Sequence, residues 1–285
     1  MMREPTASVS PACAPDPGSS AGDGDQPALT ALVRLASKRP RLVAFTGAGI
    51  STDSGIPDYR GPSGVWKRQT PLTVQAFAND PATRRGYWER RRLGYPVMAD
   101  AVPNSGHRAL ATLERAGRLR TIITQNIDGL HQKAGNDPGR VIELHGTTHT
   151  IVCVDCGART TGAEVQTWLE AHDGIPVCAV CGGTLRPATI LFGETLSAPV
   201  WAAAIAAVEA ADMLLIVGSS LVVNPAASLP LLAKQRGAAV AIINREATPL
   251  DELADIVIHG DAGPALGAFV TMLTETIPDQ AGGAG

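Results

Sequence analysis

The sequence has few aromatic residues and no strong excess of charge of either sign. Phe, Trp and Tyr make up 4% of the 285 residues, and 24 Lys and Arg against 27 Asp and Glu leave a formal charge of −3. The isoelectric point of about 6.1 argues against the basic surface that nucleic-acid-binding domains present. We therefore expect neither direct nucleic-acid binding nor attraction to an anionic membrane.

Long hydrophobic runs are also missing. No apolar stretch approaches the roughly 18 residues of a membrane-spanning helix, and the first ten residues, MMREPTASVS, lack the apolar core of a secretory signal. Hydrophobic residues still make up 45% of the chain, and the mean hydropathy is +0.07. This composition predicts a globular protein, which we expect in the cytoplasm.

The chain instead contains short aliphatic runs with helical patterns between many of them. Alternation of such runs with helices is typical of an α/β fold, here a Rossmann-like, doubly wound parallel sheet. The runs that we interpret as buried strands are 42–46, 121–124, 188–191, 213–217, 239–243 and 255–258.

The alternation is interrupted between residues 147 and 187, where we expect a smaller, inserted zinc-binding module. The Rossmann-like domain would then comprise 28–146 and 188–276. Residues 1–27 are rich in Pro, Gly, Ser and Asp and predict a disordered tail, and 277–285 predict a loose C-terminus.

Four of the five cysteines form two Cys-x-x-Cys pairs, Cys153 with Cys156 and Cys178 with Cys181. The 21 residues between the pairs (157–177) are close to the usual spacing of four-cysteine zinc sites. Four thiolates fill a tetrahedral shell, so we predict a structural zinc ion rather than a catalytic one. Thiol exchange is the less favoured alternative, because both pairs lie in a glycine-rich, irregular segment.

A glycine-rich turn, Gly47-Ala48-Gly49, follows the first predicted strand. Such a turn lets a phosphate approach backbone N–H groups. The dehydrogenase fingerprint is incomplete, since Thr52 replaces its third glycine, and a turn without any ligand is the alternative. In the next loop, Arg60 is a candidate phosphate ligand, or else the surface partner of Asp58.

A second polar cluster, Gln125, Asn126 and Asp128, comes directly after the predicted strand 121–124. In doubly wound folds ligands bind beyond the carboxyl ends of strands, although helix capping explains one such residue. His145 follows another short apolar run and is a candidate general base. A purely structural histidine is an equal alternative at this point.

Taken in order, the motifs GAGISTDSGIPDYRG, TQNIDGLH, ELHG, the paired cysteines, FGE, GSSL, INR and GDA resemble the sirtuins, the NAD-dependent protein lysine deacylases. The resemblance spans about residues 29 to 275. It implies that NAD is consumed, that the acyl group of an acyl-lysine protein or peptide passes to ADP-ribose, and that nicotinamide is released. Protein mono-ADP-ribosylation in the same pocket is the alternative activity, and a non-catalytic partner-binding module is the least favoured hypothesis.

The resemblance also assigns roles to residues. His145 would be the general base that activates a ribose hydroxyl, with Asn126 beside it. The implied NAD-binding residues are Gly47, Ala48, Gly49, Ser51, Ile56, Asp58, Arg60, Gln125, Asn126, Asp128, Gly218, Ser219, Ser220, Asn244, Arg245 and Ala262. The two edges that would hold an extended substrate peptide contain Phe192, Gly193, Glu194, Val222 and Asn224.

The segment 85–96 resembles the class II branch of the family. Tyr87 and Arg90 keep the Tyr-x-x-Arg spacing of sirtuins that prefer acidic acyl groups. The same spacing is equally that of one face of an amphipathic helix, which we favour. The sequence therefore leaves the preferred acyl chain open.

Overall fold

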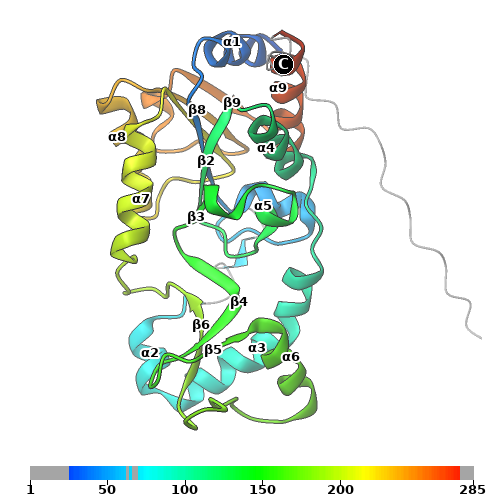
Figure 1. The fold of residues 1–285 in the computed structure, drawn as a ribbon, viewed down its shortest axis with the longest axis vertical. Helices are drawn as coiled ribbons and strands as arrows, with labels where there is room; N and C mark the ends of the chain where they lie inside the picture. Colours follow the sequence, from blue (N-terminus) through cyan, green and yellow to red (C-terminus); the bar gives the residue numbers. More distant parts are fainter. Residues whose placement is uncertain (1–25, 62–63, 66–69, 277–285) are drawn as a thin grey trace, which may run out of the picture.

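The computed structural model describes residues 26–61, 64–65 and 70–276, which form a larger and a smaller lobe (Figure 1). The larger lobe is built on a six-stranded sheet of order β3-β2-β1-β7-β8-β9, and all of its strand pairs are parallel. This is the predicted Rossmann-like sheet. Its strands are β1 (Leu42–Thr46), β2 (Leu119–Thr124), β3 (Val141–Glu143), β7 (Met213–Val217), β8 (Ala239–Asn244) and β9 (Ile256–His259).

Helices cover both faces of this sheet, and the central strands are therefore buried throughout. Along β1, Leu42 and Ala44 pack in one core, and Val43 and Phe45 pack in the other. The first face carries α1 (Gln26–Ser37), α4 (Ser105–Arg115) and α9 (Ala262–Thr276), and the second carries α7 (Ala198–Glu209) and α8 (Leu229–Gln235) (Figure 1).

The strand order reverses direction between β1 and β7. Chain connections leave these two strands toward opposite sides, so a crevice opens beyond their carboxyl ends. Short elements stand at this edge: the 3-10 helix η1 (Ala48–Ser54) after β1 and the helix α5 (Leu130–Lys133) after β2. The fold thus brings the predicted glycine turn and the predicted polar cluster to the same place.

The smaller lobe contains an antiparallel sheet of order β5-β4-β6. Its elements are β4 (Gly146–Cys153), β5 (Arg159–Thr161), α6 (Gly162–Ala171) and β6 (Leu185–Thr189). The prediction of a strand at 188–191 in the parallel sheet was wrong, because the strand there, β6, pairs with β4. Alternate residues of β6 are buried, and a short apolar run does not reveal which sheet will take it.

Two further helices pack on the smaller lobe, α2 (Val74–Asn79) and α3 (Pro81–Asp100) (Figure 1). Trp88 of α3 is fully buried in the same cluster as Ile151 and Val165. We therefore propose to count α2 and α3 with the zinc module, although they lie far before residue 147 in the sequence.

Arg91 fixes α3 to the central strand of the smaller lobe. Its guanidinium carbon lies 4.3 Å from the ring centroid of Tyr95 and 6.0 Å from that of Trp88. Its terminal nitrogens donate to the hydroxyl and the carbonyl oxygen of Thr148 at 2.8 and 2.9 Å.

Two predictions concern the chain ends. The predicted tail at 1–27 lies outside the described residues except for its last two positions, where α1 begins, and the predicted loose C-terminus at 277–285 lies wholly outside them. No helix in the described part of the chain has the length and apolar character needed to cross a membrane.

Candidate functional site

A cavity of about 490 Å³ lies between the two lobes, beyond the carboxyl ends of β1, β2, β7 and β8. Its wall contains most of the predicted site residues: Gly47, Ala48, Gly49, Asp58, Arg60, Gln125, Asn126, His145, Phe192, Gly193, Glu194, Gly218, Ser219, Ser220, Asn224, Asn244, Arg245 and Ala262. Of the predicted NAD- and peptide-binding residues, four are not among the wall residues, namely Ser51, Ile56, Asp128 and Val222.

The glycine turn is shaped by the close approach of two strand ends. A Cβ on Gly47 would lie 2.7 Å from the carbonyl oxygen of Gly218, and a Cβ on Gly49 would lie 2.8 Å from the Gly218 Cα. Gly218 itself has a φ of 63°. Glycine is therefore required at these positions by backbone packing, which leaves the turn between β1 and β7 open to a ligand.

A hydrogen-bonded network lies behind the turn. The Ser51 hydroxyl donates to Oδ2 of Asp128 at 2.7 Å, and Nδ2 of Asn126 donates to the Ser51 hydroxyl and the Gly47 carbonyl, both at 3.1 Å. The other Asp128 oxygen accepts from the N–H of Leu130 at the start of α5. Ser51 and Asp128 thus hold Asn126 from behind, and Asn126 alone of the three reaches the wall.

His145 is held in one tautomer. Its Nδ1 lies 2.9 Å from the carbonyl oxygen of Gln125, and a carbonyl only accepts, so Nδ1 carries the hydrogen and Nε2 the lone pair. Burial lowers the pKa of His145 and outweighs the opposite effect of this hydrogen bond. The side-chain amide of Gln125 donates to the Ser219 hydroxyl at 2.8 Å, which ties the ends of β2 and β7 together.

Two further histidines, His107 and His131, lie next to this network. His131 places Nε2 2.9 Å from the Thr46 hydroxyl, and its ring centroid is 5.1 Å from that of His107. Burial lowers the pKa of His131 to about 3 and that of His107 to about 4. Both rings are therefore neutral at physiological pH, and only their spatial contact, invisible in the sequence, reveals the pair.

At the end next to β8, Asn244 donates from Nδ2 to the Glu246 carbonyl at 2.7 Å. Arg245 forms an exposed ion pair with Asp261, 2.7 Å long, directly before the first residue of α9. Ile56 lies apart from this end of the cavity, because its side chain packs in a separate apolar cluster with Ala101.

Phe192 and Gly193, shortly after β6, line the cavity, and so does Asn224 in the loop after β7. Val222 points elsewhere and is 47% exposed, while its neighbour Val223 lines the cavity. Sequence reasoning missed several other wall residues, namely Tyr59, Val65, Leu72, Thr189, Ile190 and Leu196. Most of these are apolar residues of a kind found throughout the chain, so their type does not identify them as wall residues. Only the nearness of some of them to the quoted motifs could have indicated their place.

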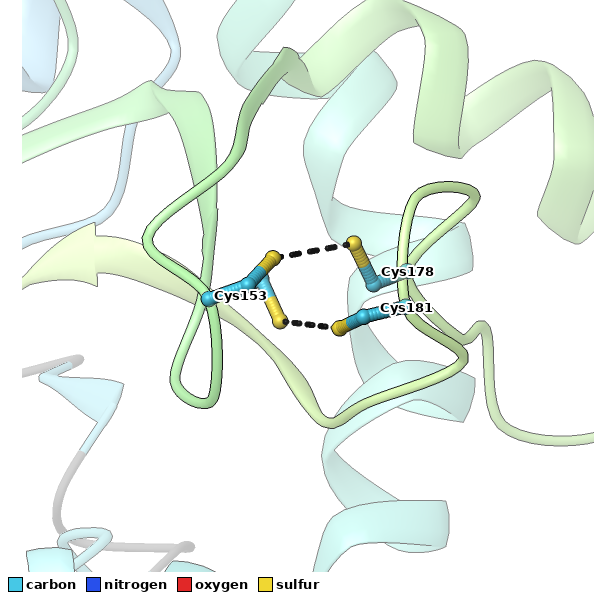
Figure 2. A group of neighbouring side chains, drawn as sticks. Cys153, Cys178 and Cys181 are labelled. Carbon is cyan, nitrogen blue, oxygen red and sulfur yellow. Dashed lines mark hydrogen bonds between the residues drawn. The ribbon is translucent and has the colours of Figure 1, made fainter.

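The four paired cysteines converge in the smaller lobe, and Figure 2 shows Cys153 facing Cys178 and Cys181. Their sulfur atoms all lie within 4.8 Å of one another. The Cys153–Cys181 and Cys156–Cys178 sulfur distances are 3.6 and 3.8 Å, and a tetrahedron with Zn–S bonds of about 2.3 Å has edges of about 3.8 Å. The donor set therefore fits a zinc ion with no position left for water.

Comparison with known proteins agrees with this geometry. The model of the Sir2 family matches residues 47–225. The NAD-dependent protein deacetylase 2 of Streptomyces coelicolor is 45% identical over 236 residues, which cover 81% of this chain and 97% of that protein. The NAD-dependent protein deacylase 2 of Pyrobaculum aerophilum is 44% identical over 239 residues, covering 83% and 92%.

Solved structures show the same arrangement. A Sir2 enzyme structure has a TM-score of 0.80 at 38% identity and covers 89% of this chain and all of its own. A Sir2 complex with a p53 peptide and NAD+ has a TM-score of 0.78 at 36% identity, covering 87% and 98%. With its cavity between a Rossmann-like sheet and a four-cysteine module, and with relatives matched over nearly their whole length, the chain belongs to the Sir2 family.

Proposed function

We propose that this chain removes acyl groups from lysine side chains of proteins, passing the acyl group to ADP-ribose and releasing nicotinamide. NAD-dependent protein deacylation is the activity for which its relatives from Streptomyces and Pyrobaculum are named. The observation that carries the assignment is His145, a neutral imidazole of fixed tautomer on the wall of the cavity. We also propose that the chain belongs to the class II branch.

The wall residues have different roles in the proposed reaction. NAD would supply an activated ribose carbon, which bonds to the acyl oxygen as its bond to nicotinamide breaks and nicotinamide leaves. His145 accepts the proton of a ribose hydroxyl at Nε2, and because burial lowers its pKa the base form persists below the usual pH range of histidine. Both Nδ2 hydrogens of Asn126 are used by Gly47 and Ser51, so Oδ1 is the atom that Asn126 offers to a ligand.

The test is nicotinamide release with a panel of acetyl-, succinyl-, lipoyl- and long-chain-acyl-lysine peptides. We expect release that depends on an acyl peptide, and His145→Ala should reduce turnover by about 10²- to 10⁴-fold while NAD still binds. The control is His172→Ala at an exposed histidine beyond the end of α6. Turnover by His145→Ala at the parent rate would contradict the role given to His145.

Intact-mass analysis separates deacylation from protein ADP-ribosylation. Loss of the acyl mass from a target protein supports the proposal. A stable ADP-ribose adduct on the target, without loss of the acyl group, would overturn it.

The same panel examines the part of the wall formed by Tyr87 and Arg90. Burial raises the pKa of Tyr87, so its hydroxyl stays protonated and can donate to a carboxylate, as can the Arg90 guanidinium. A preference for succinyl-lysine that Arg90→Met removes would assign this pair to acyl recognition. Equal effects on all acyl chains would assign it to helix packing.

A further inference from the structure

An ion pair closes the turn that leads from β6 into the cavity wall. Arg186 of β6 donates from Nη1 to Oε1 of Glu194 at 2.5 Å and from Nη2 to Oε2 at 2.7 Å. The two side chains are 17% and 19% exposed. A two-pronged contact between an arginine and a carboxylate, partly shielded from water, is stronger and more directional than an exposed ion pair.

Both partners also hold the backbone of this turn. Arg186 donates from Nη2 to the Thr189 carbonyl at 2.8 Å, and the Leu191 N–H donates to Oε2 of Glu194 at 2.7 Å. Burial tends to raise the pKa of Glu194, but the hydrogen bonds from Arg186 and Leu191 outweigh it and leave the pKa below its ordinary value. The carboxylate is therefore ionised at neutral pH, with both oxygens engaged.

The turn carries Phe192 and Gly193. The Phe192 N–H donates to the Leu72 carbonyl at 3.1 Å, and the Phe192 carbonyl accepts from the Val74 N–H at 3.0 Å. Gly193 has a φ of 85° and makes no backbone hydrogen bond to any residue in the described ranges. Its peptide groups are thus available for an extended peptide to add as a strand.

We propose that Arg186 is a positioning residue for the acyl-peptide substrate, and that Glu194 acts by holding the turn rather than by binding the peptide directly. Arg186 holds Glu194, and the pair presents Gly193 in the conformation that the peptide meets. This inference rests on the proposed deacylase function and assigns a role to a residue that the sequence analysis passed over.

The test compares Arg186→Met, Arg186→Lys and Glu194→Gln with the parent enzyme. We expect Arg186→Met to raise the KM for the acyl peptide about tenfold, equivalent to about 1.4 kcal/mol, while the KM for NAD stays within about twofold. Arg186→Lys should lie between the parent and Arg186→Met, because an ammonium cannot make the two-pronged contact. Arg159→Met, at an exposed arginine of the same sheet, is the matched control.

Amide hydrogen exchange provides a readout that does not depend on activity. Exchange at Leu191 and Glu194 should accelerate in Arg186→Met and in Glu194→Gln, with unchanged zinc content in both. Faster exchange in an enzyme that never deacylates would contradict the proposed function and leave the turn assignment standing. Unchanged exchange, or equal rises in the KM values for the peptide and for NAD, would overturn the positioning role. If Arg186→Met does not fold, the same measurements on Glu194→Gln test that role.

Discussion

His107 and His131 show how the burial of two neighbouring rings sets a chemical property of the chain. The Thr46 hydroxyl donates to Thr124, so His131 must donate to Thr46 from Nε2, and its buried Nδ1 has no partner among the described residues. A proton added there would meet an apolar surrounding and the neighbouring His107 ring. The pair is therefore held neutral next to the network of Ser51, Asn126 and Asp128.

This neutrality predicts a loss of stability in acid. An unfolded histidine takes up a proton near pH 6.5, whereas the folded pKa values are about 3 for His131 and about 4 for His107. Between pH 6.5 and 4 the unfolded state binds more protons, so the free energy of unfolding falls with falling pH, by up to about 1.4 kcal/mol per pH unit for each group.

Urea unfolding of His131→Gln and of the parent at several pH values measures this effect. The variant should lose less stability than the parent between pH 6.5 and 4. His172→Gln, at an exposed histidine, should follow the parent curve. Equal acid slopes for His131→Gln and the parent would contradict the assignment. Any effect of acid on the zinc site is common to all three proteins, so it does not alter the comparison.

Among the strands, we expect β4 and β6 to depend most on the bound zinc ion for their stability. β4 ends at Cys153, shortly before Cys156, and β6 begins shortly after the loop that carries Cys178 and Cys181. Backbone hydrogen bonds close each loop on itself, such as those from Cys153 to Ala158 and from Cys178 to Gly183, and one from Val154 to Thr184 joins the two loops. A zinc ion held by both cysteine pairs would add four metal bonds to this junction, so we expect its removal to destabilise this part of the lobe.

Removal of zinc should open the smaller lobe and spare the larger one. We expect one zinc ion per chain, and Cys181→Ser should lose it. In the metal-free protein, amide exchange should rise in β4–β6 before it rises in β1, β7 and β8, whose residues are buried on both faces. Cys13→Ser is the matched control, and full retention of zinc by Cys181→Ser would contradict the four-cysteine site.

At the scale of the whole molecule, His149 joins the two lobes. It lies on β4, and its Nε2 is 2.8 Å from the Asp128 carbonyl oxygen, so Nε2 donates and Nδ1 accepts. The Tyr95 hydroxyl of α3 lies 3.4 Å from Nδ1. The loop that carries Asn126 and Asp128 is thus tied to a helix of the smaller lobe.

Removing the hydrogen bond from His149 to Asp128 should weaken NAD binding without changing any residue of the cavity wall. We expect His149→Ala to raise the KM for NAD by about three- to tenfold, the equivalent of one net hydrogen bond. Tyr95→Phe keeps the ring that packs on Arg91 and should have a smaller effect. An unchanged KM for NAD in His149→Ala would show that the lobes are positioned by other contacts.

The parallel sheet was predicted from local patterns, and the motifs that carry the family resemblance contain many of the residues that line the cavity. Strands such as 42–46 and 213–217 are continuous aliphatic runs, and the quoted motifs follow strand ends, which the fold brings to one edge. The packing of Trp88 against β4 and the contact of His107 with His131 depend on distant segments meeting. Sequence periodicity carries no information about contacts between distant segments, so the packing of α3 on the smaller lobe and the histidine pair were found only in the structure.

The smaller lobe is not a detachable insertion. With α2 and α3 counted in the smaller lobe, as proposed above, the chain enters this lobe before α2, returns near Ala101, enters it again at Gly146 and returns after Thr189. Three of these four crossings line the cavity, where Gly61, His145 and Thr189 stand on the wall. Deleting the lobe, or grafting it onto another sheet, would therefore disturb the proposed general base His145 and the proposed peptide edge 192–194 together, because both lie next to these crossings. Length changes should be accepted only in loops of the lobe that lie away from the crossings.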